Sequence, residues 1–576
     1  MIFIPPHIVR WGKKAILSLT EGAKAKQRGE LPSLMCPNSS SLAESGDQVT
    51  DTIAAGINKG FIAGPFLTPP LRNFRSNPMN GVKQKEKIRL VMDLSRPSGN
   101  CYNENIQQGS SRSVTMSSAR QFGFSIMEAG KGAIMSKHDW SDAYKNVPVR
   151  IEDLRLQGFS WLGRYFVELS LVFGSINSVE EFDNLGELVL ALACHLSSFP
   201  RRYCHRTLDD VPVVAPSGSG LTERFSTAYL NLCSELNIKL APNCPDNNKA
   251  FTCKTEGTVL GFRFDSSSLS WSFPTEKADN LLRKIALFQS KRTTNLKTVQ
   301  EIAGSLEHIG SMIPFSKAFR LPLYLFIRKF KSSDHVQLLI PQVLRSDLAI
   351  WANMIVSSKR GLPIPTRPSL PPLSVFFCTS DAAGIDLSLS PADLEGQSFG
   401  AASILHSRDN SEFYRISRIF WPDHFIFYAE DNKGSRLAAK SSTLEAIGVI
   451  LPFISFPDLL TGSNVVLYVD NMSLIHGWNK RYLPNDIEAS VIVRALHILS
   501  NFIRCRVFIR HAPRMSSPAA TLADHLSRSS STSESEVDLA NSLSHPPKSP
   551  ALREWLRDPK VDWNLPMAML ADIRNG

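Results

Sequence analysis

Three acidic residues in the first half of the chain occupy positions that are unusual for acids. Asp139 follows the apolar residues 133–135, and Asp209 with Asp210 directly precedes the apolar segment 211–214. Adjacent carboxylates beside a predicted strand repel one another and lose hydration, so a bound cation or an exposed turn accommodates them best. A solvated Asp-Asp turn is the simpler interpretation. The chemical interpretation is a site for divalent cations, because carboxylate oxygens are the ligands that Mg²⁺ prefers.

A second set of acids lies in the last third of the chain. Asp381 follows a predicted strand at 375–378, and Asp470 follows another at 465–469. Glu445 lies on a helix predicted over residues 442–451, and Asp524 belongs to the segment 522–528. For each residue alone, exposure on the surface is the default interpretation. Together they could share two metal ions, which activate water and stabilise a leaving oxygen in phosphodiester hydrolysis.

The order of motifs through residues 60–335 resembles the palm and fingers of a reverse transcriptase. Segments 60–66, 89–90 and 93–95 are similar to the fingers of DIRS-type retrotransposon polymerases. The palm motifs follow in the family's order: Asp139 to Tyr144 (DWSDAY), residues 171–174 (LVFG) with Ser178 and Phe182, the acid pair in 208–210 (LDD), and the primer-gripping hairpin at 260–265 (LGFRFD).

This resemblance implies roles for individual residues. Asp139 and Asp209 would be metal ligands, with Asp210 as the supporting acid of the same site. The implied substrate-binding residues are Lys83 and Arg89 on the triphosphate, Tyr144 under the sugar, and Ala143 and Gly174 beside them. The implied cofactor is Mg²⁺, with Mn²⁺ as a substitute, because two such ions stabilise the entering and leaving oxygens of nucleotidyl transfer.

Three features depart from the family's pattern. Thr207 stands where an aromatic residue is usual, and Val179-Glu180 replaces the usual Ala-Pro after Ser178. Pro212 follows the acid pair and removes a backbone donor from the predicted hairpin. These departures affect the expected rate of DNA synthesis and the expected binding of the template, whereas the metal-binding acids are retained.

Residues 373–530 resemble a ribonuclease H domain with its Asp-Glu-Asp-Asp set. The resemblance implies that Asp381, Glu445, Asp470 and Asp524 bind the metals and catalyse cleavage of RNA in a hybrid. His511 would assist product release, although a solvated histidine at a strand end is an equal interpretation. Ala519-Ala520 replaces the polar residue that often precedes the last acid.

Composition sets the wider limits. The chain has 576 residues, of which 43% are hydrophobic and 20% charged, which excludes a mainly disordered chain, a collagen-like fibre and a coiled coil. The net charge of +11 favours a nucleic-acid partner over a generally basic surface, and basic residues are frequent on amphipathic helices predicted between 276 and 334.

Cysteine usage and apolar content bear on location. The nine cysteines show no Cys-x-x-Cys spacing and suit a reducing compartment. The apolar stretch 447–460 is too short for a membrane span and contains two prolines, and residues 1–19 lack a secretory layout. We expect an intracellular protein of the cytoplasm or nucleus, without a membrane.

The elements that must position the acids form an α+β and α/β multidomain chain, a right-hand polymerase followed by a ribonuclease H-like domain. The clearest predicted boundary is a Pro-rich connector at 361–372. The predicted parts are a loosely structured N-terminal lead-in at 1–55, fingers and palm at 56–275, a helical thumb or connection at 276–356, a linker at 357–372, the ribonuclease H-like domain at 373–530, and a Ser-rich linker and tail at 531–576 with a short helix at 552–563.

The sequence therefore predicts an RNA-directed DNA polymerase of a retrotransposon with a fused ribonuclease H. Its partners would be an RNA template, a DNA primer, an RNA-DNA hybrid and deoxynucleoside triphosphates. The alternative is a catalytically decayed, domesticated retroelement protein that binds nucleic acid without synthesis.

Overall fold

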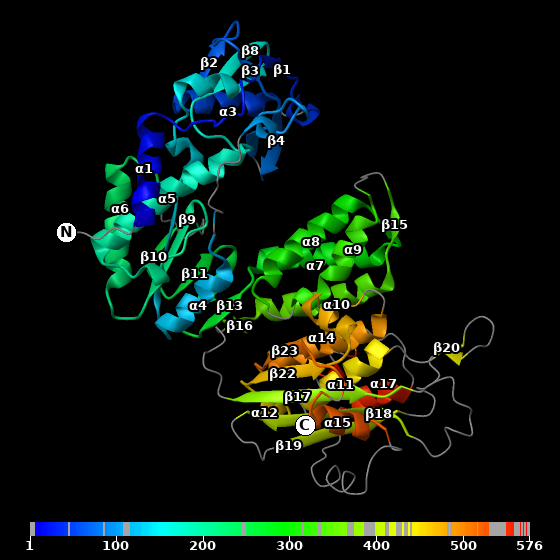
Figure 1. Cartoon of the computed structure of the whole chain (residues 1–576). Helices are drawn as coiled ribbons and strands as arrows, with labels where there is room; N and C mark the ends of the chain where they lie inside the picture. The colour runs from blue at the N-terminus through cyan, green and yellow to red at the C-terminus, as the bar shows by residue number, and fades with distance from the viewer. Residues whose placement is uncertain are drawn as a thin grey trace. The chain divides into compact units, whose positions relative to one another are not determined.

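The computed structural model of the chain (Figure 1) contains many helices and several separate sheets. It describes residues 6–43, 46–84, 87–106, 114, 116–242, 249–313, 316–331, 336–365, 374–384, 398–408, 414–421, 429–430, 436–437, 441–480, 483, 486–514, 516–528, 549–557, 565, 568–569 and 572. None of the helices in this part of the chain is both long and apolar enough to span a membrane.

The chain folds into two compact units, which are described separately. The first contains Met1–Ser272 and Gly361–Ile364, and the second contains Phe273–Arg360 and Pro365–Gly576. Both combine helices with sheets. The predicted α+β and α/β multidomain class is confirmed.

A three-stranded antiparallel sheet with strand order β10-β6-β9 forms the palm of the first unit. The central strand β6 (Ile134–Asp139) pairs with β9 (Asp210–Ala215) and β10 (Phe251–Lys254). Helix α6 (Leu221–Glu235) packs on these strands, and α4 (Ala119–Ala129) contacts β9. Five residues of β9 are buried, so its apolar sequence is continuous and not alternating.

The fingers combine a five-stranded sheet with a hairpin. The sheet has the order β1 (Leu34–Met35), β3 (Arg75–Ser76), β7 (Gly158–Trp161), β8 (Arg164–Glu168) and β2 (Ile62–Phe66). The hairpin joins β4 (Met79–Gln84) to β5 (Lys87–Met92). One cluster of buried apolar residues links both parts.

The N-terminal segment differs from the predicted loosely structured lead-in. It forms α1 (Pro6–Thr20), α2 (Ser40–Ala43) and α3 (Gly46–Asn58), and α1 packs against α5 (Ile176–Ser197). Val49 and Ile53, one helical turn apart, are buried in the fingers cluster. Their apolar stripe is narrow, and the polar residues around it concealed the helix in the sequence.

A four-stranded sheet completes the first unit. It has the order β11 (Glu256–Val259), β12 (Phe262–Asp265), β13 (Ser270–Ser272) and β16 (Leu362–Pro363). Leu260 and Gly261 both have positive φ angles, +48° and +84°, as the turn of the β11–β12 hairpin requires. Strand β16 lies within the predicted Pro-rich linker, whose residues 366–372 are outside the described part.

The second unit begins with four packed helices, α7 (Thr275–Ser290), α8 (Leu296–Gly310), α9 (Leu321–Arg328) and α10 (Gln342–Lys359). They correspond to the predicted thumb or connection, and α10 extends three residues beyond the boundary predicted at 356. The short strands β14 (Thr293–Thr294) and β15 (Leu338–Leu339) pair beside them.

A five-stranded mixed sheet follows, with the order β19-β18-β17-β22-β23. Strands β17 (Val375–Ala382), β18 (Gly400–Ser407) and β19 (Tyr414–Phe420) are antiparallel, whereas β22 (Asn464–Val469) and β23 (Arg506–His511) run parallel to β17. Neighbouring residues of β18 reach opposite faces: Ser403 donates to the Gly448 carbonyl of α11 (Ser441–Ser455), and Ala402 packs against Leu526 of α15 (Pro518–Leu526).

Helices α13 (Met472–Lys480) and α14 (Ile487–Phe502) also belong to the second unit. The remaining short elements are α12 (Pro457–Leu460), β20 (Ala429–Glu430), β21 (Arg436–Leu437) and α17 (Pro550–Arg557). Helix α17 falls in the tail where the sequence predicted a helix at 552–563. Residues 558–563 of that prediction lie outside the described part.

Candidate active sites

The acids of the first half converge at one end of the palm sheet. Asp139 ends β6 and lies opposite Asp210, the first residue of β9. Thr207 and Asp210 exchange two backbone hydrogen bonds of 2.9 and 3.2 Å, which makes Leu208 and Asp209 a two-residue turn. Leu208 has a φ of +55°, and Asp209 accepts a hydrogen bond from the Trp140 amide at 3.2 Å. The turn therefore places Asp209 beside the end of β6.

The three carboxylates influence one another electrostatically. The pKa of Asp210 is raised to about 6: burial is the largest cause, Lys137 opposes it, and Asp139 and Asp209 add to it. Burial and then Asp209 raise the pKa of Asp139. Excess negative charge in a partly buried place favours a divalent cation, which would return these acids to their ionised form.

Two lysines partly offset this charge, and sequence analysis missed both. The Lys137 ammonium, on β6, lies 3.8 Å from Asp210, and the Lys249 ammonium lies 3.9 Å from Asp139. Lys137 is buried, and it lies directly across the sheet from Pro212. A lysine two residues before Asp139 on a buried strand was the available signal.

Aromatic rings line the side of the site next to Asp209. The Tyr144 ring lies 4.8 Å from that of Phe173 and 5.3 Å from that of Phe182, measured between centroids. The Arg89 guanidinium lies 4.2 Å above the Phe173 ring. Burial and then Asp209 raise the pKa of Tyr144, so this phenol is close to the turn.

The other predicted substrate-binding residues lie on adjoining elements. Gly174 has a φ of +104°, and a Cβ there would stand 2.4 Å from the Met92 carbonyl oxygen, so only glycine fits. Ala143 begins the short 3₁₀ helix Ala143–Asn146. Lys83 pairs with Ile88 in the β4–β5 hairpin. The Lys83 side chain lies outside the described part of the structure.

The departures from the family pattern have structural counterparts. The Thr207 hydroxyl donates to the Ser117 carbonyl at 2.6 Å, and Pro212 still accepts from the His205 amide at 3.0 Å. Glu180 forms ion pairs with Lys14 at 3.6 Å and Lys26 at 3.5 Å in the N-terminal segment. The residues that differ from the pattern are therefore integrated into the first unit.

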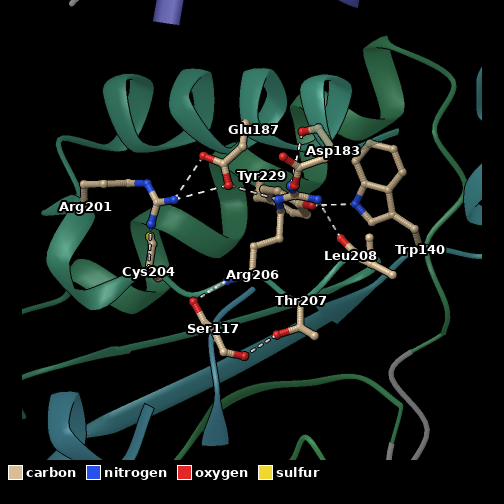
Figure 2. Close-up of polar contacts among 10 residues, drawn as sticks. All are labelled: Ser117, Trp140, Asp183, Glu187, Arg201, Cys204, Arg206, Thr207, Leu208 and Tyr229. Atoms are coloured by element: carbon tan, nitrogen blue, oxygen red, sulfur yellow. Dashed lines mark hydrogen bonds and ion pairs between the residues drawn. The ribbon is translucent and has the colours of Figure 1, made fainter. Parts of the chain in front are cut away.

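An ion-pair network centred on the buried Arg206 and Asp183 lies beside the turn (Figure 2). Arg206 forms ion pairs with Asp183 and Glu187 of α5, and Arg201 forms a second pair with Glu187 at 3.1 Å. Arg206 also donates to the Leu208 carbonyl at 3.0 Å. Sequence analysis missed Arg206.

In the second unit the fold brings together three of the four predicted acids. Asp381 lies near the end of β17, Asp470 directly follows β22, and Glu445 lies on α11. Because β17 and β22 are parallel, with Thr379 paired to Tyr468, Asp381 and Asp470 reach the same level of the sheet. Within the described part of the chain, these acids form the one group of three potential ligands whose atoms lie within 4.8 Å of one another.

The residues of this group fit a divalent cation. Asp381 and Glu445 are buried, and the Glu445 Oε2 atom is buried without a hydrogen-bond partner. Burial, then Asp381 and Asp470, raise the pKa of Glu445 well above its ordinary range, and burial raises that of Asp381 to about 6. A buried carboxylate oxygen without a donor is costly, and a cation would satisfy it.

The fourth predicted acid, Asp524, lies beside this group and is engaged by arginines. Its carboxylate forms ion pairs with Arg514 and Arg528, each at 2.5 Å. It still raises the pKa of Asp381, so it is a neighbour of the group. Arg514 lines the same pocket as Asp381 and Asp470, and sequence analysis missed it because this arginine is ten residues from its carboxylate partner.

His511 ends β23 on the other side of β22. It is exposed and pairs with Val469, the residue before Asp470. The histidine is therefore close in register to Asp470.

Comparison with solved structures finds foamy viral protease-reverse transcriptases. The protein in complex with an RNA/DNA hybrid has a TM-score of 0.46 at 14% identity, covering 86% of this chain and 57% of that one. The dRH form in complex with double-stranded DNA has a TM-score of 0.45 at 14% identity, covering 86% and 74%. A further complex with double-stranded DNA has a TM-score of 0.43 at 14% identity, covering 89% and 95%.

No protein-family model and no curated protein matches the sequence. The structural similarity to the foamy viral proteins is one of fold and is low. The functional assignment therefore depends on the geometry of the two acid sites.

Proposed function

We propose that this chain is the RNA-directed DNA polymerase of a retrotransposon, most similar to DIRS-type elements, with a fused ribonuclease H. The observation that carries the proposal is the pairing of Asp139 with Asp210, with Asp209 in the turn between Thr207 and Asp210. The acid group on β17, β22 and α11 supports the nuclease.

In the polymerase site, Asp139 and Asp209 would hold the metal ions, and Asp210 would support them from the start of β9. When bound, Mg²⁺ or Mn²⁺ supplies charge stabilisation for the entering and leaving oxygens. Arg89, with Lys83, would bind the triphosphate of the incoming nucleotide. Tyr144 would lie beneath its sugar, beside Ala143 and Gly174.

In the nuclease site, Asp381, Glu445 and Asp470 would hold the metal, and Asp524 would act beside them. The substrate would be the RNA strand of the hybrid that polymerisation leaves. We also propose the predicted domain limits, except for the N-terminal lead-in. The partners would be a template, a primer and deoxynucleoside triphosphates, and the location would be intracellular.

The alternative is a nucleic-acid-binding protein that has lost catalysis. It is favoured by the two arginines that engage Asp524, which compete with any metal for this carboxylate. Such a protein would retain affinity for an RNA-DNA hybrid without extending or cutting it.

Primer extension on poly(rA)/oligo(dT) with Mg²⁺ separates these two functions. We expect the unaltered chain to extend the primer and the Asp139→Asn variant to be inactive. Asp142→Asn is a matched control, because Asp142 is exposed, pairs with Lys59 at 2.8 Å, and has a φ of +50° that asparagine tolerates. Hybrid binding without extension by the unaltered chain would support the alternative.

A further inference from the structure

The turn that presents Asp209 adopts a conformation that its own residues do not favour. Leu208 has a φ of +55°, in the left-handed region that non-glycine residues rarely occupy, and a leucine side chain cannot stabilise it by a local hydrogen bond. The surrounding structure must therefore maintain this conformation.

Two hydrogen bonds from outside the turn fix its two carbonyl groups. The Arg206 guanidinium donates to the Leu208 carbonyl at 3.0 Å, and the Trp140 amide donates to the Asp209 carbonyl at 3.2 Å. The peptide joining Leu208 to Asp209 is planar, so fixing the Leu208 oxygen also fixes the Asp209 amide. The direction in which Asp209 projects thus depends on Arg206.

The guanidinium is itself held rigidly against α5. It donates through Nε to Glu187 at 3.1 Å and through Nη2 to the Asp183 carbonyl at 3.1 Å, in addition to its ion pair with the Asp183 carboxylate. Its side chain is only 4% exposed. A Cβ at Gly186 would stand 2.4 Å from its Nη1 atom, so the absence of a side chain there admits the guanidinium.

Figure 2 shows that the network joins helix α5 to the segment that leads into the turn. The Arg206 carbonyl accepts from the Ser117 amide at 3.0 Å, so the backbone of this arginine is fixed as well. Arg201 and Arg206 balance the charges of Asp183 and Glu187. Burying the Arg206–Asp183 ion pair, whose two side chains are each 4% exposed, contributes less stability than apolar packing of similar volume, so filling space alone does not explain an arginine here.

We propose that Arg206 is a positioning residue of the polymerase site, which transmits the rigid geometry of α5 to Asp209 through the Leu208 carbonyl. This inference rests on the proposed polymerase function. It assigns a role to a residue that is not among the predicted metal ligands and acts through the backbone of the turn. The predicted consequence is a change in the catalytic step and not in substrate binding.

The test compares Arg206→Lys with two other variants of the full chain. Lysine keeps the charge but lacks the planar fork that reaches Leu208, Asp183 and Glu187 together. Gly186→Ala keeps Arg206 and displaces its guanidinium from α5, so it serves if Arg206→Lys folds poorly. Arg201→Gln is the matched control: it removes the other cation of the network, whose second bond is to the Cys204 carbonyl and not to the turn.

For Arg206→Lys and Gly186→Ala we expect kcat for nucleotide addition to fall about 10- to 100-fold, as misplacement of a reacting group does. The KM for the nucleotide and the Kd for primer-template should stay within about threefold. Hydrogen exchange at the Thr207 and Asp210 amides should become roughly tenfold faster, because these amides close the turn. Arg201→Gln should leave kcat within about threefold and this exchange unchanged.

Unchanged kcat and exchange in Arg206→Lys would overturn the inference, and so would an equal loss in Arg201→Gln, which would indicate only a structural network. If the unaltered chain does not extend a primer, the proposed function fails instead. The exchange rates then still decide whether Arg206 holds the turn, because they need no activity.

Discussion

Single carboxylates in this chain differ in how far the fold has removed them from water. Asp210 and Asp381, one in each acid site, both have a pKa raised to about 6, with burial as the largest cause. Asp458, an exposed residue on α12, has no such environment. Desolvation of this kind is frequent at groups that bind ions or protons, and it also occurs at buried structural ion pairs.

The raised pKa of Asp381 predicts a pH dependence of metal binding. A carboxylate must lose its proton to bind a metal, so affinity for Mn²⁺ should fall at least about tenfold per pH unit below pH 6, and more steeply because Glu445, whose pKa is also raised, must lose its proton too. Without metal, folding stability changes with pH in the direction opposite to that of metal affinity. The folded-state pKa exceeds the ordinary value of 3.8, so the stability this group contributes is complete below 3.8 and is lost as the pH rises through 6.

Calorimetric titration with Mn²⁺ at several pH values measures this dependence. The Asp458→Asn variant should show the profile of the unaltered chain. An affinity that does not change between pH 5 and pH 7 would exclude Asp381 as a ligand.

The position of Tyr144 predicts that its ring selects deoxynucleotides over ribonucleotides at the polymerase site. Its ring would occupy the space that a ribose 2′ hydroxyl needs, so Tyr144→Val should raise incorporation of ribonucleotides relative to deoxynucleotides by roughly 10- to 100-fold. Tyr144→Phe keeps the ring and should leave the ratio unchanged. If valine also leaves it unchanged, Tyr144 only packs against Phe173 and Phe182.

At the scale of elements, one buried ion pair joins the helical part of the second unit to its sheet-containing part. Arg494 of α14 donates to Asp347 of α10 at 2.7 and 3.3 Å, and both side chains are almost fully buried. Burial raises the pKa of Asp347 to about 6 even though Arg494 opposes this effect. Desolvation therefore outweighs the pairing, and the carboxylate depends on its partner.

Removing the arginine alone should be costly. Arg494→Met leaves Asp347 buried without its guanidinium, and we expect the free energy of unfolding to fall by about 3–5 kcal/mol. The double variant Arg494→Met, Asp347→Leu should recover most of that loss, because it removes both charges. Denaturant unfolding measures both, and a double variant as unstable as the single one would contradict this explanation.

At the scale of the whole molecule, the two acid sites belong to different compact units. Asp209 lies in the first unit and Asp470 in the second. Each site is assembled from strands of its own sheet, β6 with β9 and β17 with β22. The two activities should therefore be separable by single substitutions.

Asp209→Asn should reduce DNA synthesis by roughly 10³-fold or more and leave hybrid cleavage measurable, and Asp470→Asn should do the reverse. Each variant is the control for the other, with primer extension and hybrid cleavage measured on one preparation. The unaltered chain should cut the hybrid with Mg²⁺ or Mn²⁺ and spare single-stranded RNA. Loss of both activities from one substitution would indicate misfolding or a wrong assignment.

The sequence alone predicted the features that depend on local pattern. Apolar runs that end in acids predicted strands ending near Asp381 and Asp470, and the structure has strands at both places. The mixed α and β multidomain class followed from the same patterns. The N-terminal segment was read wrongly, because the burial of Val49 and Ile53 depends on strands that come later in the chain.

Only the tertiary structure decided which distant residues surround the acids. Arg206 finds its carboxylates 19 and 23 residues away on α5, and Lys249 approaches Asp139 from more than a hundred residues further along the chain. Tertiary structure also paired Asp524 with arginines beside the three acids that converge. Strand ends and turns are encoded by neighbouring residues, whereas charge pairing depends on which elements pack together, and the spacing of residues in the sequence does not specify that.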